Sequence, residues 1–599
     1  MLDLSPDREV KQWLTAFDDA ITRADFDAVA QLFLPQAFWR DLAALTWNIV
    51  TVEGRNAIRD LAETCIPRTA PRSWRVVGAA QSREDAVQAI VTFETEAARC
   101  HAVIRLKNGR CWTLMTAAAE LKGFEESCGV RRPRGAPDRY HRGRKSWARQ
   151  RAQDVWELGI THQPYCLIVG AGHCGLALAA RLKQLGVPTL MIDKRERPSD
   201  GWRDRHDNLS LHSPSWFDHM PYLPYPENWP LHPSKDQFAN WLDAYATVME
   251  LDIWPKSECL NADFDLAADE WRVQVLRDGK ATELRPKQLV FATGLVGKPT
   301  IPDLPGKHIF RGEQRHASSP PRDGSYAGCD CVVIGAGTTA HDISAELWEA
   351  GARVTMIQRS PTIVVRHEQV LAGIAALYGD EARAAGMTTE TADLLFASLP
   401  HRVEVEMHQR LTAQIKDQDA PFYEKLRNAG FLLTFGEDGA GILPQILRNP
   451  SGYYMDVGAS ELIIDGRIKV KAGVGVKRLT ERTVILTDDT ELAADVVVYA
   501  TGFEIAPAPR MLSGTMATKV GRLWGLGSGL RNDPGPWEGE LRNICKPTAQ
   551  RGLWFHSNGV AGSRFYSRIL ALQIKARQVG LPTPVYPVSE PAAGYIQHG

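Results

Sequence analysis

The pattern of apolar and polar residues divides the chain into two main parts. Residues 8–33 (REVKQWLTAFDDAITRADFDAVAQLF) place apolar side chains at the three-to-four-residue spacing of amphipathic helices, whereas residues 99–121 alternate as a half-buried strand does. Helices followed by a run of strands are typical of an α+β unit. From Gln163 the pattern changes to apolar strand, glycine-rich turn and helix in succession, which predicts a doubly wound parallel α/β sheet.

Two segments lack this periodicity. From Arg131 to Arg151 the chain has nine Lys or Arg against one acidic residue, with Pro and Gly interspersed, which favours a linker over a packed element. A basic patch for an anionic partner is the alternative, although the formal net charge of -1 does not favour nucleic-acid binding. Residues 581–599 are rich in proline and are expected to form an extended tail.

The second part begins with a glycine-rich loop, CLIVGAGHCG, in which a short apolar strand precedes Gly170, Gly172 and Gly175. Glycines at these positions permit a tight turn, close approach of the backbone to a pyrophosphate, and close packing of the next helix. Asp193 ends the following predicted strand, where a carboxylate can accept a hydrogen bond from a ribose hydroxyl, and Lys194 comes next. The loop therefore predicts a site for an adenine dinucleotide.

A second loop repeats the first. The segment that starts at Gly335 aligns with Gly170 without a gap over 24 residues, and its turn is formed by Gly335, Gly337, Thr338, Thr339 and Ala340. At the end of its second strand Gln358 replaces the ribose-binding carboxylate and Arg359 follows. An arginine at this place favours a 2′-phosphate, and hence NADPH over NADH, with NADH kept as a second possible reductant.

Two later strands end in the same turn, LVFATG at Gly294 and VVVYATG at Thr501 and Gly502. Between them, FRGEQRHASS contains Phe310, Gly312 and His316, which resembles the F-x-G-x-x-x-H fingerprint of class B flavin-dependent monooxygenases. Residues 199–242 resemble the same superfamily, closest to its bacterial type II branch and to plant indole-pyruvate monooxygenases. The resemblance extends over about residues 163–580. Flavin disulfide reductases share the plan, but the chain has no C-x-x-C pair.

Residues 1–125 resemble small NTF2-like or SnoaL-like cone domains, on the basis of FDDAITRADFDAVAQLF, FWRD and GRNAIRDL. The resemblances imply two Rossmann-like domains, one for FAD and an inserted one for NADPH, after an α+β cone. The predicted divisions are the cone 1–125, a basic linker 126–162, an FAD-binding domain in two parts, 163–325 and 458–580, an NADPH-binding domain 326–457 with a helical insertion, and a tail 581–599.

The resemblance also implies the chemistry. NADPH reduces FAD, the reduced flavin takes up O2 as a C4a-peroxide, and one oxygen atom enters a ketone by Baeyer–Villiger oxidation or enters a nitrogen or sulfur atom. Trp202 falls where the family packs an aromatic residue near the flavin, and His212 where many members have an active-site asparagine. An imidazole that titrates near neutral pH would bias the peroxide chemistry, with a structural role for His212 as the alternative. His316 is expected to link the domains.

Two other hypotheses stay open. The chain could release H2O2 from NADPH and O2, or its N-terminal domain could serve assembly. The expected partners are a small-molecule substrate, O2 and a second copy of the chain in a homodimer, without nucleic acid or a metal. The absence of a long apolar run, an acidic start and ten scattered cysteines favour a cytoplasmic protein without a membrane anchor.

Overall fold

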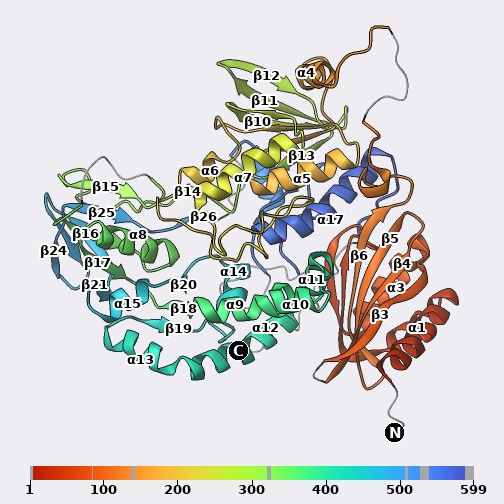
Figure 1. Ribbon diagram of the computed structural model, residues 1–599, viewed down its shortest axis with the longest axis horizontal. Helices are drawn as coiled ribbons and strands as arrows, with labels where there is room; N and C mark the ends of the chain where they lie inside the picture. Colours follow the sequence, from red (N-terminus) through yellow and green to blue (C-terminus); the bar gives the residue numbers. More distant parts are fainter. Residues whose placement is uncertain are drawn as a thin grey trace.

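The computed structural model describes residues 5–83, 85–135, 142–319, 326–505, 510–526 and 539–586. Figure 1 shows a mixed α/β molecule in which an N-terminal sheet stands beside two sheet-and-helix regions formed by the rest of the chain. Within the described residues, no helix combines the length and the apolar character that crossing a membrane requires.

The N-terminal region is a six-stranded sheet with three helices. The strand order is β2-β1-β6-β5-β4-β3, and all neighbouring pairs are antiparallel except β1 and β6. The elements are α1 (Pro6–Thr22), α2 (Phe26–Gln31), β1 (Phe33–Leu42), β2 (Ile49–Glu53), α3 (Gly54–Thr69), β3 (Arg72–Arg83), β4 (Ala86–Glu94), β5 (Ala98–Lys107) and β6 (Arg110–Leu121). Helix α1 packs on β3 and α3 packs on β1.

Aromatic side chains fill the interior between these helices and the sheet. Phe33 and Trp39 stack with ring centroids 5.9 Å apart, and Phe17 meets both rings edge-on. Trp74 stacks on Phe93 at 4.1 Å. Offset and edge-on aromatic pairs of this kind stabilise a core beyond the area that they bury, so this interior is a packed core.

A parallel sheet of order β27-β13-β7-β8-β9 carries the first nucleotide loop. Its strands are β7 (Cys166–Val169), β8 (Thr189–Ile192), β9 (Ile253–Trp254), β13 (Gln288–Phe291) and β27 (Leu553–Phe555). Helices α5 (His173–Gln184), α7 (Lys235–Val248) and α17 (Val560–Gln578) accompany it, and α17 packs on α5. The short helix α6 (Asp200–Arg203) and the antiparallel strands β10 (Ser257–Asp265), β11 (Glu270–Arg277) and β12 (Lys280–Leu284) complete this region.

A second parallel sheet, of order β15-β25-β16-β17-β21, carries the second loop. Its strands are β15 (Glu313–His316), β16 (Asp330–Ile334), β17 (Arg353–Gln358), β21 (Ile468–Ala472) and β25 (Val496–Tyr499). Two helices belong to the same region, α8 (Thr338–Glu349) and α15 (Ala459–Ile464). A separate antiparallel sheet is formed by β22 (Val476–Leu479), β23 (Thr483–Leu486) and β24 (Glu491–Ala493). The chain enters and leaves through β14 (Val296–Pro299) and β26 (Phe503–Ile505), which pair antiparallel. The two sheets are therefore joined by a two-stranded ribbon.

A helical segment follows β17, within residues 326–457, for which the family resemblance implied a helical insertion. It contains α9 (His367–Tyr378), α10 (Asp380–Ala384), α11 (Thr389–Phe396), α12 (His401–Gln418), α13 (Ala420–Asn428) and α14 (Ile442–Arg448), beside the small parallel sheet of β18 (Thr362–Arg366), β19 (Leu433–Thr434) and β20 (Tyr453–Asp456). Figure 1 shows α11 and the end of α17 beside the N-terminal sheet, and α17 packs on β6.

The linker prediction for residues 131–151 is partly wrong. Residues 136–141 lie outside the described residues, but Trp147–Glu157 form helix α4, whose first turn is capped by the Ser146 hydroxyl. Arg151 in α4 donates to the carbonyl oxygens of Glu250 and Leu251, at 2.5 and 3.1 Å. These bonds hold the helix against the end of α7, so part of the basic segment is packed.

The tail prediction also needs correction in the part that is described. Tyr586 is 3% exposed, its amide donates to the carbonyl oxygen of Thr46 at 2.9 Å, and its hydroxyl donates to Asp60. The chain after α17 therefore packs on the N-terminal region instead of extending away from it. Residues 587–599 lie outside the described part of the chain.

Candidate active site

The first glycine loop is shaped by contacts that only glycine permits. Gly170 follows β7 with a φ of +104°, and a Cβ there would lie 2.5 Å from the carbonyl oxygen of Ala292. A Cβ at Gly175 would lie 2.1 Å from the carbonyl oxygen of Gly170. At Gly172, which caps α5, a Cβ would meet no atom within 4 Å. The loop thus leaves open space at the positive end of α5, where a pyrophosphate fits.

Asp193 stands at the carboxyl end of β8, as the ribose-binding residue of such a site should. Its Oδ2 accepts from the Ala171 amide and its Oδ1 from the Arg195 amide, both at 2.9 Å. A carboxylate oxygen has two lone pairs, so each oxygen can still accept from a ribose hydroxyl. Lys194 beside it is exposed.

The second loop repeats this construction. Gly335 has a φ of +130°, and a Cβ there would lie 2.3 Å from the carbonyl oxygen of Ala500, in the second ATG turn. Gly337 caps α8, and the Thr338 hydroxyl donates to the carbonyl oxygen of Tyr453 at 2.9 Å. Thr339 is half-buried and Ala340 is buried in the first turn of α8. Each loop is therefore seated on its own ATG turn.

The strand ends distinguish the two sites. Gln358 is fully buried, where its side-chain amide donates to the carbonyl oxygen of Leu432 and its Oε1 accepts from the Leu432 amide, both at 2.8 Å. It serves packing and does not face a ribose. Arg359 is exposed beside Gly475, where a Cβ would lie 3.8 Å from its Cδ. Its charge is thus available to a phosphate at the carboxyl end of β17.

His316 lies at the ribbon that joins the two sheets. Its Nε2 donates to the carbonyl oxygen of Gly502 at 3.0 Å, and its Nδ1 accepts from the Ser318 hydroxyl at 2.8 Å. Its ring meets Phe503 edge-on at 5.0 Å. In the same turn the Thr501 hydroxyl donates to the carbonyl oxygen of Thr300. His316 therefore ties the end of β15 to the start of β26.

Trp202 reaches the first loop through His173. Its ring packs edge-on against Phe238 with centroids 4.9 Å apart and lies 5.9 Å from the ring of His173, which directly follows Gly172. His173 in turn donates from Nε2 to the carbonyl oxygen of Asn558 at 2.9 Å. Trp202 therefore lies close to the first glycine loop.

His212 lies between the two nucleotide regions, and its predicted titration near neutral pH is wrong. Its Nε2 is 3.8 Å from Oδ2 of Asp342 in α8, and His367 donates from Nε2 to its carbonyl oxygen at 3.1 Å. Burial, together with the neighbouring His367 and other basic side chains, lowers the pKa of His212 to about 4. A desolvated imidazole among cationic groups loses its proton easily, so His212 is neutral at physiological pH.

His206 was not singled out from the sequence, yet its ring lies between two acidic side chains of α8. It is 3% exposed, with Nδ1 3.5 Å from Glu346 and Nε2 3.7 Å from Asp342. These acids are four residues apart on one face of α8, a spacing that the sequence does show. Burial raises the pKa of Asp342 to about 6.

The start of α17 adjoins the first loop. The helix begins at Val560, and Asn558 lies just before it. The Asn558 amide donates to Sγ of Cys174, and that thiol donates to the Asn558 carbonyl oxygen, both at 3.3 Å. The Ala561 amide donates to the buried carboxyl of Asp218 at 3.4 Å. The positive end of α17 thus lies at the carboxyl edge of the first sheet.

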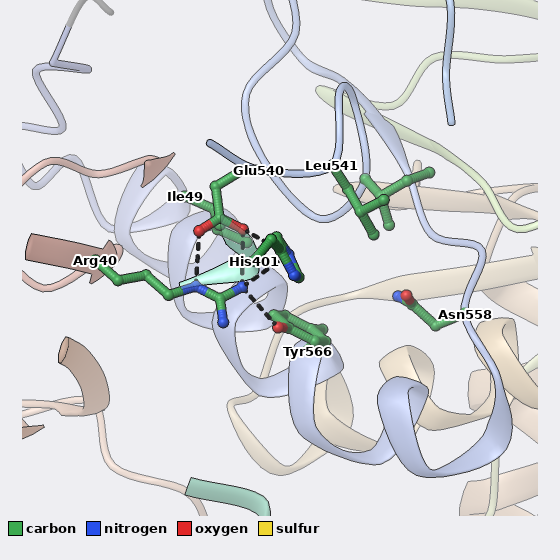
Figure 2. Close-up of a pocket in the computed structure, with 8 residues that line it drawn as sticks. Arg40, Ile49, His401, Glu540, Leu541, Asn558 and Tyr566 are labelled. Atoms are coloured by element: carbon green, nitrogen blue, oxygen red, sulfur yellow. Dashed lines mark hydrogen bonds and ion pairs between the residues drawn. The ribbon is translucent and has the colours of Figure 1, made fainter. Parts of the chain in front are cut away.

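A small pocket, with a cavity volume of about 20 Å³, lies beside Asn558 and was not predicted (Figure 2). It is lined by Arg40, Ile49, His401, Glu540, Leu541, Ile544, Asn558 and Tyr566. These residues come from the N-terminal sheet, from α12, from residues 540–558 and from α17. No sequence spacing relates positions so far apart, so no local signal could have found them.

The ten cysteines all lie in the described part of the chain, and all are free thiols. Burial raises the pKa of Cys65, Cys166 and Cys259, which keeps these thiols protonated. Among the described residues, no group of three or more His, Cys, Asp or Glu side chains could hold a metal ion.

Comparison with known proteins agrees with this arrangement. Residues 167–423 match the pyridine nucleotide-disulphide oxidoreductase family. The chain is 32% identical over 346 residues to indole-3-pyruvate monooxygenase YUCCA1 of Oryza sativa subsp. japonica, covering 57% of this chain and 77% of that protein. It is 29% identical over 365 residues to probable indole-3-pyruvate monooxygenase YUCCA1 of Arabidopsis thaliana, covering 59% and 78%.

Among solved structures, the open crystal structure of cyclohexanone monooxygenase superimposes with a TM-score of 0.51 at 18% identity, covering 71% of this chain and 90% of that one. The same enzyme bound to epsilon-caprolactone gives a TM-score of 0.51 at 18% identity, covering 70% and 90%. This level of identity supports the fold: two Rossmann-type regions in the order found here.

Proposed function

Because the chain belongs to the class B flavin-dependent monooxygenases, enzymes that use FAD and NADPH, we propose that it inserts one oxygen atom of O2 into a small ketone. In the overall reaction NADPH supplies two electrons, one oxygen atom enters the substrate, and the other leaves as water. In a Baeyer–Villiger oxidation, a carbon–carbon bond next to the carbonyl breaks and two carbon–oxygen bonds replace it, giving an ester.

The observation that carries this proposal is a pair of glycine loops that have the same backbone construction but are followed by different residues at the end of the next strand. Gly170 and Gly335 are each pressed against the ATG turn of their own sheet. Only the first loop is followed by a carboxylate, Asp193, and only the second by an exposed arginine, Arg359. Such a chain can hold a resident dinucleotide in one site and a 2′-phosphorylated reductant in the other.

The residues of the first site fit FAD. The N-terminus of α5, with open space at Gly172, would receive the pyrophosphate, and Asp193 would accept from the ribose. Trp202 and His173 would wall the site, and the N-terminus of α17 would face the ring system and stabilise negative charge there. Bound FAD would supply the electron-transfer and oxygen chemistry that amino-acid side chains lack.

The second site fits NADPH. The N-terminus of α8, behind Gly337 and Thr338, would receive the pyrophosphate, and Arg359 would pair with the 2′-phosphate. The side chain of Gln358 forms hydrogen bonds with Leu432. The end of this strand therefore offers no carboxylate to the ribose hydroxyls of NADH. We therefore infer a preference for NADPH.

Two arguments favour a ketone over an amine or sulfide. The relatives compared above are named for indole-3-pyruvate, whose oxidised group is a ketone next to a carboxylate. His212 is neutral at physiological pH and can donate or accept a hydrogen bond there without adding charge. N- and S-oxygenation and release of H2O2 remain the competing outcomes.

The test supplies NADPH and 18O2 to the purified enzyme with ketones, sulfides and amines, and follows products by mass spectrometry. We expect one labelled oxygen in the ketone-derived product and NADPH consumption that matches it. Labelled sulfoxide or N-oxide alone would shift the reaction class, and H2O2 equal to the NADPH consumed, without labelled product, would overturn the monooxygenase proposal.

We further propose a cytoplasmic homodimer in which residues 1–125, the NTF2-like cone, serve structure and assembly. Ten free thiols suit a reducing compartment. Strand β3 is the edge of the N-terminal sheet and carries Val77, which is 50% exposed. Edge strands are ready surfaces for pairing. Light scattering should give twice the chain mass, and Val77→Lys should give a monomer; an unaffected dimer would exclude this edge.

A further inference from the structure

One face of α8 carries two acids that lie against a segment of the first nucleotide region. Asp342 and Glu346 are four positions apart and therefore share a face of the helix, where His206 and His212 of residues 205–212 contact them. A separate, apolar face of α8 packs on the second sheet. The two nucleotide regions thus meet at a charged surface.

Residues 205–212 are fixed to the first region at the start of α7. The Lys235 amide donates to the carbonyl oxygen of Leu209 at 2.8 Å, and the Leu211 amide donates to that of Pro233 at 2.9 Å. Leu209 and Leu211 are themselves buried. The segment is therefore a firm part of the first region, and its contacts with α8 are contacts between the two nucleotide regions.

His206 is the centre of this contact. Its Nδ1 lies 3.5 Å from Oε2 of Glu346, and its Nε2 lies 3.7 Å from Oδ2 of Asp342. The side chain is 3% exposed, and among the described residues neither ring nitrogen has a hydrogen-bond partner, nor has that oxygen of Glu346. Buried polar atoms without partners cost free energy, so an approach of α8 to His206 that closes these contacts is favourable.

The charges at this contact are of opposite sign on the two regions. An imidazolium can donate to both carboxylates, whereas a neutral imidazole has one N–H and can donate to one. Arg205 precedes His206 and adds a cationic group near Asp342. Burial raises the pKa of Asp342 to about 6, and the charges of His206 and Arg205 oppose that rise. The first region therefore attracts the acidic face of α8.

The position of α8 decides where the second nucleotide site lies. The helix begins at Thr338, directly after the glycine turn of the second loop. A shift of α8 relative to the first region therefore shifts that loop relative to the first loop. The covalent connection between the two sheets is the two-stranded ribbon of β14 and β26, so side-chain contacts between the regions must fix their orientation.

On the basis of the proposed function, we propose that His206, Asp342 and Glu346 form a clamp that holds the second nucleotide site in position relative to the first. His206 is then a positioning residue for hydride transfer from NADPH to FAD. The hydride carries two electrons and one proton, its transfer leaves NADP+ and reduced flavin, and His206 neither gives nor takes a proton in this step. A displacement of about 1 Å can slow a reaction about 100-fold, so the clamp governs the rate of transfer.

Anaerobic stopped-flow measurements on the FAD-loaded enzyme test the clamp, because they separate the affinity for NADPH from the rate of flavin reduction. For His206→Gln we expect the limiting rate constant of reduction to fall by about tenfold or more, with the dissociation constant of NADPH within about twofold of wild type. An unchanged rate constant would overturn the proposal, as would a loss that comes entirely from weaker NADPH binding.

Glu346→Gln is an independent variant, because it removes a charge and keeps the size of the side chain. In His206→Gln the two acids have lost their shared partner, so adding Glu346→Gln should cause little further loss of rate. Additive losses would show that the two residues do not act through each other. Glu349→Gln is the control on the same helix: this acid is exposed, accepts from Asn208 at 3.2 Å, and should leave reduction unchanged when replaced.

Hydrogen–deuterium exchange gives a readout that does not depend on turnover. In FAD-loaded His206→Gln without NADPH, the amides of residues 205–212 should exchange faster than in wild type, and those of β7 and β16 should not. No acceleration in that segment would mean that no clamp exists. If β7 and β16 accelerate as well, the variant has lost fold stability, and Glu346→Gln decides by the same measurements.

Failure of the clamp and failure of the proposed function give different results. If NADPH does not reduce the flavin of the wild-type enzyme, the proposed function fails, and the exchange pattern still decides whether the clamp exists. If NADPH reduces the flavin but 18O2 labels no product, the oxygenase proposal fails and the clamp stands or falls by the variants. If ketones are oxygenated and His206→Gln is reduced as fast as wild type, the function stands and the clamp does not.

Discussion

Arg40 and Glu540, 500 positions apart in the sequence, form a two-pronged ion pair with N–O distances of 2.7 and 2.8 Å. Their side chains are 1% and 2% exposed. Burial alone would raise the pKa of Glu540, but the guanidinium of Arg40 outweighs it and keeps that pKa well below its usual range. Both groups are therefore charged, and each compensates the other in a site that water does not reach.

Arg40→Ala should destabilise the protein strongly. A buried carboxylate that loses its partner costs about 3–5 kcal/mol, and among the described residues Glu540 would then keep the contacts with His401 and Thr51. The free energy of unfolding, measured in urea by circular dichroism, checks this. Arg59→Ala is the control, because its pair with Asp27 is 49% and 80% exposed and should contribute almost nothing. Similar losses for both variants would contradict the expectation.

Gly170→Ala and Gly335→Ala should separate the two nucleotide sites. Each added methyl group would press on a backbone carbonyl oxygen, at 2.5 Å from Ala292 and 2.3 Å from Ala500, and each φ is positive. We expect Gly170→Ala to purify without flavin colour, and Gly335→Ala to keep FAD while its KM for NADPH rises more than about tenfold. Gly373→Ala, in open space on α9, should behave as wild type; loss of FAD from Gly335→Ala would contradict separate sites.

Arg359→Ala should weaken NADPH and leave NADH almost unchanged. The side chain is exposed at the carboxyl end of β17, where its charge is free to meet a 2′-phosphate that NADH lacks. Steady-state kinetics should show kcat/KM for NADPH falling by about 10- to 100-fold, the effect of one lost charge-assisted bond. Equal losses for both reductants would exclude 2′-phosphate recognition by Arg359.

His212→Gln should leave the shape of the pH profile unchanged. Because burial lowers the pKa of His212 to about 4, its proton is already gone at pH 5.5, and no inflection between pH 5.5 and 8.5 should arise from it. The measurement is kcat/KM for the ketone over that range in both enzymes. A wild-type inflection near pH 6.5 that disappears in the variant would show that His212 titrates in the working enzyme.

The folded protein should lose stability at alkaline pH, because His401 loses its proton there. Its pKa is about 9 in the folded protein against 6.5 for the free side chain, so the protonated form favours folding. That contribution is complete below about pH 6.5 and is lost as pH rises through 9, in total on the order of 3 kcal/mol. Unfolding free energies from pH 6 to 10 should decline more steeply in wild type than in His401→Gln; parallel declines would contradict this.

The nucleotide loops could be predicted because their requirements are local. Gly170 and Gly335 need positive φ values and the absence of a Cβ, and the strand, turn and helix that surround each loop follow within about 25 residues. The same reasoning singled out Asp193 and Arg359 at the ends of β8 and β17, whose binding roles stay predictions, and the family resemblance implied the helical segment after β17. His316 donates to the carbonyl oxygen of Gly502, and the domain-linking role that the family resemblance implies for it stays a prediction.

The predictions that failed concern residues whose contacts come from distant parts of the chain, which a local sequence pattern does not show. His212 has an ordinary imidazole, but its pKa is set by burial and by His367 and other basic groups that come from separate segments. The pattern of residues 131–151 predicted a solvated linker, yet Arg151 lies in α4 and donates to carbonyl oxygens just after α7. Tyr586 looked like part of a loose tail, yet it binds Thr46 and Asp60.

The sequence by itself determined the two glycine loops and their order, because backbone sterics and helix ends act over a few residues. Only the tertiary structure decided that the N-terminal region closes a pocket beside Asn558, and that Arg40 meets Glu540, His401 and Tyr566 there. Burial gives such contacts their strength, because removal from water makes an unpaired charge costly and a paired one stable. Burial is a property of the whole fold, so it cannot be read from any one segment.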